Sequence, residues 1–419
     1  MGKLIIKDVE VSGKRVLMRV DYNVPMAAQN GQMVINDSTR IKETLPTLRH
    51  LIDRGAKVVL MAHLGRPEGK REASMSLRPV AVMLGEMLGL PVQFADDCIG
   101  EAVEKQVASL KNGEILLLEN VRFYGEEESN DSGFSEKLAV LGDIFANDAF
   151  GAAHRAHAST VGVATVIAKR GGACCGGLLM ERELQFLGDE LENPERPFVV
   201  ILGGAKVSDK IKVIDRLLEK ADVFLIGGAM AYTFKLADGI CIGKSLVEPD
   251  KTEVANAAII KAKQKGVTFL IPTDNVIADP VDTGRKNRKG RAIFDLQNPR
   301  VNTARDIPEE SEGVDIGPST AAAFASEISK AKTILWNGPM GIFEDSRFAA
   351  GTFAVAQAVV DATKNNGAKS IIGGGDSVKA LNVAGLGSEV SFMSTGGGAS
   401  LEFLEGKELP GVAALGNAR

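Results

Sequence analysis

The sequence predicts an α/β protein of two doubly wound parallel-sheet domains, joined by a hinge and with a ligand cleft between them. First, short β-branched apolar runs alternate with longer amphipathic stretches along the 419 residues, as they do in βαβ units. Second, this length exceeds the roughly 250–300 residues at which a single core stops growing. Third, many of the 46 glycines directly follow the apolar runs, at the edge where open α/β sheets bind ligands.

The apolar runs are predicted to be buried parallel strands, because strands covered on both faces are almost continuously apolar. They are Val16–Val20, Val58–Ala62, Ile115–Leu118, Phe198–Leu202, Val223–Ile226, Phe269–Pro272, Thr333–Trp336 and Ser370–Ile372. The stretches between them have the apolar period of helices. They are Asp37–Arg54, Leu77–Leu88, Asp209–Lys220, Glu253–Lys265 and Ala349–Thr363.

A polar stretch separates the two halves, with two prolines and four carboxylates from Gly188 to Pro197. Such a composition is typical of a domain boundary. We therefore expect a first domain over residues 1–187 and a second over 188–404, connected by a helix that starts near Leu179. The charged and aperiodic segment Asp282–Glu312 is predicted to form surface loops with short strands.

The charge balance limits the possible partners. With 54 acidic against 49 basic residues the net charge is −5, so no broad positive field exists to bind nucleic acid or an anionic membrane. The four cysteines are too few and too scattered for a disulfide framework, which indicates a reducing compartment. The start of the chain lacks an apolar signal core, and no apolar run reaches the roughly 20 residues of a membrane span. We expect a cytoplasmic monomer that acts on small molecules.

Three segments of the second half run into consecutive glycines. Glycine lets the backbone approach a ligand closely, and the free N–H groups at a helix start attract anions. A single glycine-rich turn is more often a tight turn than a phosphate site, but three in one domain favour phosphate binding. They are Leu202–Lys206, Ile372–Ser377 and Ser394–Ser400.

Two lysines and an aspartate add charge to these turns. A helix starting near Ser208 would present Lys206 and Lys210 near one face, and cations at a helix start are unfavourable unless an anion lies between them. The alternative is that both lysines are solvated surface charges. Asp376 follows the second glycine run, where it could hold Mg²⁺ on a nucleotide phosphate or serve as a helix N-cap.

One motif is misleading. The segment Gly239–Ser245 resembles a P-loop but is one residue too short, with Asp238 at the position of the first glycine. Because it follows a helix-like segment, it is predicted to be a surface loop. No G-x-G-x-x-G follows the first strand, which argues against a dinucleotide-binding oxidoreductase.

Arginine and histidine residues follow the predicted strands of the first half. The groups are Asp21–Asn23, Arg40, His63–Arg66, Glu119–Arg122 and Asn147–His157. Guanidinium groups that converge at a sheet edge suit a small molecule with both phosphate and carboxylate, because they bind such anions bidentately. Asp21 and Asn23 would then bind substrate hydroxyls. A surface salt bridge is the competing interpretation for each arginine alone.

A metal site is the alternative for His154 and His157, although a third ligand at suitable spacing is missing.

These segments resemble the phosphoglycerate kinase family, and the match extends from Arg19–Pro25 to Glu405–Gly411. The most specific motifs stand in the family's order: His63–Pro67, Asn147–Gly151, Leu202–Val207, Trp336–Gly341 and Ser394–Ser400. The resemblance implies reversible phosphoryl transfer between 1,3-bisphosphoglycerate and MgADP, giving 3-phosphoglycerate and MgATP in glycolysis and gluconeogenesis. It implies Mg²⁺ as the cofactor, held by Asp376 through the nucleotide phosphates.

The resemblance also implies which residues bind each substrate. On the first domain, those for 3-phosphoglycerate are Asp21, Asn23, Arg40, His63, Leu64, Gly65, Arg66, Arg122 and Arg155. On the second domain, those for the nucleotide are Lys206, Lys210, Gly317, Asn337, Glu344 (on the ribose), Gly374, Gly375, Asp376 and Ser377. The implied catalytic groups, which stabilise the moving phosphoryl group, are Arg40, Lys206, Gly375 and Gly398. The chain end, residues 405–419, would return to pack on the first domain.

Three positions depart from the family's usual residues: Ser377 replaces Thr, Ala229 replaces a glycine, and Phe392 replaces a His or Tyr. Ser377 keeps the hydroxyl, Ala229 would alter the adenine pocket slightly, and Phe392 puts in question a hinge hydrogen bond made there by a polar ring.

In the implied reaction the carboxylate nucleophile is already anionic and needs no general base, so the enzyme must supply alignment and charge stabilisation. Substrates on separate domains imply closure about Gly188–Pro197, which also expels water.

Two other classes remain open. A non-catalytic sugar-phosphate or nucleotide binding protein would have the glycine-rich turns without needing a basic cluster on a second domain, and an assay of ATP consumption with 3-phosphoglycerate separates it from a kinase. A nicotinamide oxidoreductase would bind NADH, which fluorescence detects.

Overall fold

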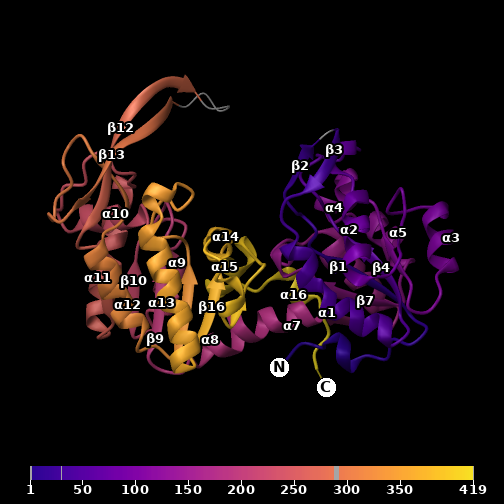
Figure 1. Cartoon of the computed structure of the whole chain (residues 1–419). Coiled ribbons are helices and arrows are strands. Elements are labelled where there is room, and N and C mark those ends of the chain that lie inside the picture. The colour runs from indigo at the N-terminus through magenta and orange to yellow at the C-terminus, as the bar shows by residue number, and fades with distance from the viewer. Residues whose placement is uncertain (1, 30, 287–291, 419) are drawn as a thin grey trace. The chain divides into compact units, whose positions relative to one another are not determined.

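The computed structural model describes residues 2–29, 31–286 and 292–418, which form two compact units. Unit 1 is Met1–Gln185 with Lys407–Arg419, and unit 2 is Phe186–Gly406. Each has its own sheet (Figure 1), and each has its own apolar core. Among the helices of the described residues, none combines the length and apolarity needed to cross a membrane.

The sheet of unit 1 has six parallel strands in the order β5-β6-β4-β1-β7-β8. Their bounds are β1 (Arg15–Val20), β4 (Lys57–Met61), β5 (Val92–Phe94), β6 (Ile115–Leu117), β7 (Ile144–Asp148) and β8 (Cys174–Gly176). The chain builds one side of the sheet from β1 to β6 and then crosses to β7 on the other side of β1. The carboxyl ends of β1 and β7 therefore form a topological switch point, where open α/β sheets bind ligands.

The remaining elements of unit 1 cover the sheet or lie at its edges. The helices are α1 (Thr39–Asp53), α2 (Arg78–Leu88), α3 (Glu101–Ser109), α4 (Gly125–Glu128), α5 (Ser132–Ala139), α6 (Val163–Lys169), α7 (Leu178–Leu184) and α16 (Pro410–Ala413), and a hairpin is formed by β2 (Met26–Gln29) and β3 (Gln32–Ile35). The end of the chain is part of this unit because Gly411 donates its N–H to Ala153 O at 2.8 Å. From α7 the chain continues through a π-helical turn, Gln185–Asp189, into α8 (Glu190–Glu192).

The main sheet of unit 2 also has six parallel strands, in the order β11-β10-β9-β15-β16-β17. They are β9 (Phe198–Leu202), β10 (Val223–Ile226), β11 (Thr268–Leu270), β15 (Thr333–Asn337), β16 (Lys369–Gly373) and β17 (Phe392–Met393). The helices are α9 (Ile211–Leu217), α10 (Met230–Ala237), α11 (Thr252–Gln264), α12 (Pro318–Ile328), α13 (Ala350–Asn366), α14 (Gly375–Val383) and α15 (Gly398–Leu404). The chain changes sides between β9 and β15, which gives a second switch point. The predicted fold class of two doubly wound parallel-sheet domains is confirmed.

The prediction for Asp282–Glu312 was wrong about the strands. Its described part contains long antiparallel strands, β12 (Asn275–Lys286) and β13 (Ala292–Asn302), and β14 (Glu312–Ile316) pairs with the other edge of β12. Residues 303–311 do form an irregular loop, and residues 287–291 lie outside the described part of the chain. In Figure 1 the β12–β13 ribbon extends away from the rest of its unit. Side chains are mostly exposed along β13 and along the part of β12 from Val281 onward, so this part of the sequence lacks the apolar alternation that a half-buried strand shows.

The expected helix start near Ser208 was also wrong, since α9 begins at Ile211 and Lys210 is its N-cap residue. The reason is that Ser208 donates from both its N–H and its hydroxyl to the carboxylate of Glu248, at 3.0 and 2.6 Å. Lys206 therefore lies in an exposed turn before the helix. The N-cap of α14 is Gly374, so Asp376 lies inside the first turn of that helix.

Candidate active site

The carboxyl edge of the unit 1 sheet collects polar residues from three neighbouring strands. Asp21 follows β1, where its carboxylate lies 2.6 Å from the guanidinium of Arg40 at the start of α1. Asn23 accepts the N–H of Gly65 at 2.9 Å. Gly65 has φ +66°, and a Cβ there would lie 2.8 Å from the sulfur of Met75. The turn after β4 therefore requires glycine at this position.

His63 lies at the centre of the arginine cluster. It is 6% exposed, and its Nδ1 is 2.9 Å from Nη2 of Arg19. Burial, followed by the positive charges of Arg19, Arg122, Arg40 and Arg155, lowers the pKa of His63 well below 6.5. At neutral pH the cluster therefore consists of a neutral imidazole among four guanidinium groups, an environment that favours an anion.

The other predicted residues of this group differ in exposure. Arg122 is 4% exposed, donates from Nη1 to Gly65 O at 2.9 Å, and its Nε lies 3.3 Å from Glu128. The N–H of Leu64 donates to Asn120 at 3.3 Å. Arg155 is partly buried and its Nε lies 3.2 Å from Nε2 of His154, whereas Arg66 is exposed.

A buried network behind the cluster was not predicted. Arg19 is 1% exposed, and its Nε donates to the hydroxyl of Ser159 at 2.8 Å. That hydroxyl donates to the buried carboxylate of Glu127 at 2.6 Å. The available signal was an arginine inside an otherwise apolar strand, because a charge is buried only when it is paired or hydrogen-bonded.

The alternative of a metal site concerns His154 and His157. Nδ1 of His157 lies 3.8 Å from Glu127, and burial lowers the pKa of His157 to about 4, with the neighbouring arginines adding to the effect. In the part of the chain that the structure describes, no three His, Cys, Asp or Glu side chains form a group that could hold a metal ion.

In unit 2 the loops after β9, β10 and β15 are joined by backbone hydrogen bonds. Gly203 donates to Asn337 O at 3.0 Å, Gly204 to Pro339 O at 3.2 Å, and Gly228 to Met340 O at 2.8 Å. A Cβ on Gly203 would collide with Pro339 O. Gly203 is therefore required for close contact between two loops, and Gly204, with φ +111° and open space beside it, is the glycine of this pair that leaves room for a ligand.

Three polar side chains come together at the carboxyl ends of β15 and β16. Nζ of Lys210 donates to Oδ1 of Asn337. Burial lowers the pKa of Lys210 to about 8, while the charges of Asp209 and Asp376 act to raise it. The buried Nδ2 of Asn337 has no hydrogen-bond partner within the described residues. An ammonium and a free amide N–H are therefore available here for an anionic ligand.

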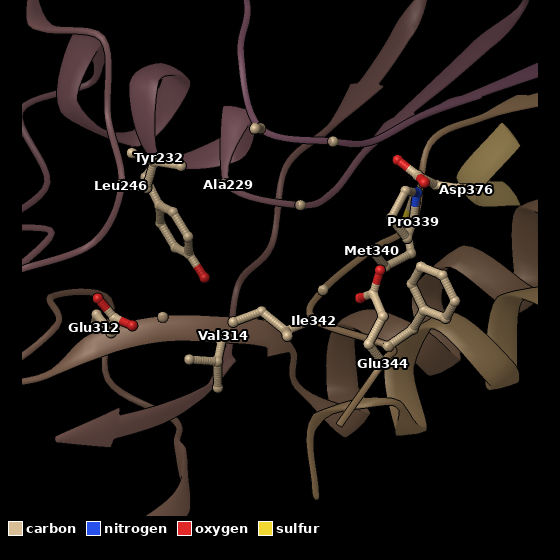
Figure 2. Close-up of a pocket in the computed structure, with 16 residues that line it drawn as sticks. Ala229, Tyr232, Leu246, Glu312, Val314, Pro339, Met340, Ile342, Glu344 and Asp376 are labelled. Atoms are coloured by element: carbon tan, nitrogen blue, oxygen red, sulfur yellow. The ribbon is translucent and has the colours of Figure 1, made fainter. Parts of the chain in front are cut away.

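Next to this group is a pocket of about 350 Å³, within the range of small-molecule sites. Its apolar lining includes Ala229, Leu246, Val314, Met340 and Ile342. Figure 2 shows Glu344 and Asp376 on one side of the pocket and Tyr232 and Glu312 on the other. The pocket thus has an apolar middle and two polar ends.

The remaining predicted residues of unit 2 lie around these groups. Gly317 is the N-cap of α12, and a Cβ there would collide with the carboxylate of Asp274; it is not among the pocket-lining residues. The hydroxyl of Ser377 accepts the N–H of Gly338 at 2.6 Å. Gly375 and Gly398 are the first residues of α14 and α15, and both are exposed.

Comparison with known proteins identifies the family. The model of the family "Phosphoglycerate kinase" matches residues 6–407. The chain belongs to the phosphoglycerate kinase family. The phosphoglycerate kinase of Chloroherpeton thalassium is 53% identical over 418 residues, with all of both chains covered, and that of Chlorobium chlorochromatii is 52% identical over 417 residues, again with full coverage. The solved structure of phosphoglycerate kinase from Coxiella burnetii has a TM-score of 0.82 and 39% identity, covering 98% of each chain.

Membership in the phosphoglycerate kinase family confirms the predicted enzyme class. The chain is a phosphotransferase with phosphoglycerate kinase function, and the role of this family is in glycolysis. The family identity implies 3-phosphoglycerate or 1,3-bisphosphoglycerate and ATP or ADP as substrates.

The departures from the usual kinase residues have visible structural settings. Ala229 lines the pocket. Phe392 is 2% exposed and stacks on Phe186, with ring centroids 4.6 Å apart and planes 7° from parallel. Phe186 belongs to the π-helical turn that follows α7. An aromatic stack therefore fixes this turn to β17 at the position where a polar ring would offer a hydrogen bond.

Proposed function

We propose that this kinase binds 3-phosphoglycerate at the arginine cluster of unit 1 and MgATP at the pocket of unit 2, and transfers the phosphoryl group reversibly between them. The observation that carries the proposal is the neutral, buried His63 among four guanidinium groups, since such a site needs a multiply charged anion. The chain is further proposed to act in the cytoplasm as a monomer.

The substrate assignment in unit 1 follows from charge. Arg66, Arg122 and Arg155 would bind the phosphate of 3-phosphoglycerate, because guanidinium groups match phosphate oxygens bidentately. Arg40, which Asp21 orients through the 2.6 Å ion pair, would reach the carboxylate end. His63 and Asn23 would bind the hydroxyl and the glycerate oxygens, and the backbone of Leu64 and Gly65 would shape the wall of the site.

The nucleotide assignment follows from the two polar ends of the unit 2 pocket. Lys206, Lys210 and the free amide of Asn337 would contact the phosphates, together with the N–H groups of Gly374, Gly375 and Ser377 at the start of α14. Glu344 lines the same side of the pocket as Asp376 and would accept from the ribose hydroxyls. The apolar middle would hold the base.

The residues present suit Mg²⁺. Magnesium is usually held by one or two carboxylates plus substrate phosphates, with water completing the shell. Asp376 is an exposed carboxylate in the first turn of α14, and its negative charge acts on Lys210, which is proposed to contact the phosphates. When bound, Mg²⁺ would neutralise phosphate charge and favour attack at the terminal phosphorus.

In the chemical step the carboxylate of 3-phosphoglycerate attacks the γ-phosphorus of ATP, and the bond to the β-γ bridging oxygen breaks. The nucleophile is already anionic, so no general base is required. The contribution of the protein is alignment and stabilisation of the charge on the transferring group. We assign this role to Arg40, Lys206 and the backbone N–H groups of Gly375 and Gly398. Excluding water from the aligned substrates limits hydrolysis.

A coupled assay of ATP consumption with 3-phosphoglycerate tests the proposal, with Lys206→Ala as the decisive variant. We expect turnover to fall strongly while calorimetry still detects 3-phosphoglycerate binding, because Lys206 acts on the nucleotide phosphates. Lys212→Ala is the control, since Lys212 is an exposed lysine six residues along the chain. Loss of 3-phosphoglycerate affinity in Lys206→Ala with normal turnover at saturation would show that the substrate assignment is wrong.

A further inference from the structure

The end of the unit 2 pocket opposite Glu344 and Asp376 carries polar groups that phosphoryl transfer does not use. Tyr232 and Glu312 line this end (Figure 2). The Tyr232 hydroxyl accepts from Nδ2 of Asn275 at 3.3 Å. A Cβ on Gly313 would collide with the Tyr232 hydroxyl. Glycine at 313 therefore lets this hydroxyl lie directly against β14, beside Glu312.

Glu312 differs from Glu344, a carboxylate at the opposite end of the pocket, in having no partner. Glu344 lies 3.6 Å from Nζ of Lys379. The carboxylate of Glu312 makes no hydrogen bond or ion pair with any residue that the structure describes, although the residue is partly buried. Burial alone raises the pKa of Glu312. A partly buried carboxylate without a partner carries a desolvation cost, which a ligand with N–H donors would remove.

The position of Glu312 defines which part of a nucleotide it would meet. If the phosphates lie at Lys210 and the ribose at Glu344, as the proposed function states, the base lies over Val314 and Ile342 and its far edge points to Tyr232 and Glu312. This inference rests on that proposed orientation. We propose that Glu312 is the base-specificity residue of the nucleotide site and that its carboxylate favours guanine nucleotides by accepting N–H groups from the base edge.

The chemistry of the two purines explains the direction. Guanine presents two adjacent donors, N1–H and N2–H₂, which match the two oxygens of a carboxylate, an acceptor-only group. Adenine presents one amino donor beside the N1 lone pair, and this lone pair would face a carboxylate oxygen. A glutamine side chain has one donor and one acceptor, so it suits adenine and leaves guanine with a mismatched donor.

The test compares Glu312→Gln with the unaltered enzyme, using MgATP and MgGTP as separate substrates. We expect the ratio of kcat/KM for MgGTP to that for MgATP to fall by about tenfold or more in the variant, the scale of one bidentate base contact. Glu310→Gln is the matched control, because Glu310 lies two residues away and pairs with Lys244 on the surface. This control should leave the ratio unchanged.

Calorimetric titration of MgADP and MgGDP into the same proteins separates the two proposals. If the unaltered enzyme transferred no phosphoryl group with either nucleotide, the proposed function would fail, yet the titrations would still measure what Glu312 does. A selective loss of MgGDP affinity in Glu312→Gln supports the role of Glu312. Ratios and affinities that stay unchanged, or that move toward guanine, overturn it.

Discussion

The two candidate sites, the arginine cluster of unit 1 and the pocket region of unit 2, differ in how their charged side chains are buried and paired. In unit 1 two arginines of the cluster are buried and held by neighbouring groups: Arg19 and Arg122 are 1% and 4% exposed, and Arg19 contacts His63 directly. In unit 2 Lys206 is exposed, and the tightly packed parts are backbone loops joined by hydrogen bonds. Unit 1 thus buries part of its guanidinium cluster, whereas unit 2 has an exposed lysine beside loops joined by backbone hydrogen bonds.

This difference has a physical consequence for each site. Guanidinium groups remain charged at any physiological pH, so their burial requires a compensating network, which Ser159 and Glu127 provide. Lysine can lose its proton when it is desolvated, as the lowered pKa of Lys210 indicates. We therefore expect stability to depend on the charges of unit 1, and pH-dependent binding to depend on those of unit 2.

The largest expected effect is on stability. Arg19→Met should lower the free energy of unfolding by about 3–5 kcal/mol, the usual cost of leaving one buried charge without its partner, because Glu127 then remains buried opposite an apolar side chain. Urea unfolding followed by circular dichroism measures this, and the fluorescence of Trp336, the only tryptophan, reports on unit 2 separately.

Lys206→Met is the matched control for that experiment. Its side chain is exposed, so the change should alter stability by about 0.5 kcal/mol or less. Equal destabilisation by the two variants would contradict the contrast between buried and exposed cations. The double variant Arg19→Met/Glu127→Gln should be less destabilised than the sum of its parts, since the two residues share Ser159.

Next in size is a difference between two arginines of unit 1. Arg40→Ala should lower kcat by about 10²-fold or more, the scale for one preorganised charge-stabilising donor, because Arg40 is assigned to the transferring phosphoryl group. Arg122→Ala should act mainly on KM, because a contact made equally in the ground and transition states affects binding only. Steady-state kinetics with 3-phosphoglycerate varied at saturating MgATP measures both. An effect of Arg40→Ala mainly on KM and of Arg122→Ala mainly on kcat would contradict this assignment of roles.

A smaller effect concerns pH and Lys210. With its pKa lowered to about 8, the free enzyme loses this charge as pH rises through 8, and anionic phosphates bind the charged form better. Affinity for MgADP should therefore fall above pH 8, by at most about tenfold per pH unit because one proton is taken up. Calorimetry between pH 7 and pH 9 checks this.

Two comparisons sharpen the pH experiment. Lys210→Arg should remove the decline, because arginine keeps its charge over this range. Binding of 3-phosphoglycerate should stay level, since the guanidinium groups do not titrate and a phosphate monoester with a second pKa of about 6 is already ionised. A decline of equal slope for both ligands would show that Lys210 is not its source.

The smallest expected effect is a few-fold difference in salt sensitivity. Binding of 3-phosphoglycerate should weaken with ionic strength, because it depends on charge pairs open to solvent, whereas binding of adenosine depends on apolar contact and should change little. Titrations of each ligand at low and high salt give the two slopes. Equal slopes would count against the separation of an ionic site from an apolar one.

Many of the strands and loops of this protein could be predicted from its sequence, because the patterns that predict them are contiguous along the chain. Continuous apolar runs such as Phe198–Leu202 and Val223–Ile226 coincide with β9 and β10. Parallel strands that are buried on both faces are almost continuously apolar, so they can be predicted without knowing which strands pair with them. The truncated P-loop at Gly239–Ser245 was correctly predicted to follow a helix, since α10 ends at Ala237.

The features that could not be predicted depend on contacts between residues that are far apart along the chain. The helix after Lys206 starts late because Glu248, forty residues away, binds Ser208. The outer part of the β12–β13 ribbon forms by pairing between strand segments that are mostly exposed, so these segments carry no apolar pattern. Such pairing leaves little trace in composition.

The sequence by itself determined the fold class and the family, because strand patterns and motifs are contiguous along the chain, and it predicted a set of polar side chains for each site. Only the tertiary structure decided which of these side chains are buried and which have partners. It showed that Arg19 completes the cluster around His63, that Gly203 serves loop packing, and that Glu312 lies unpaired in the pocket wall. Burial and pairing depend on residues far apart in the chain, so no local pattern encodes them.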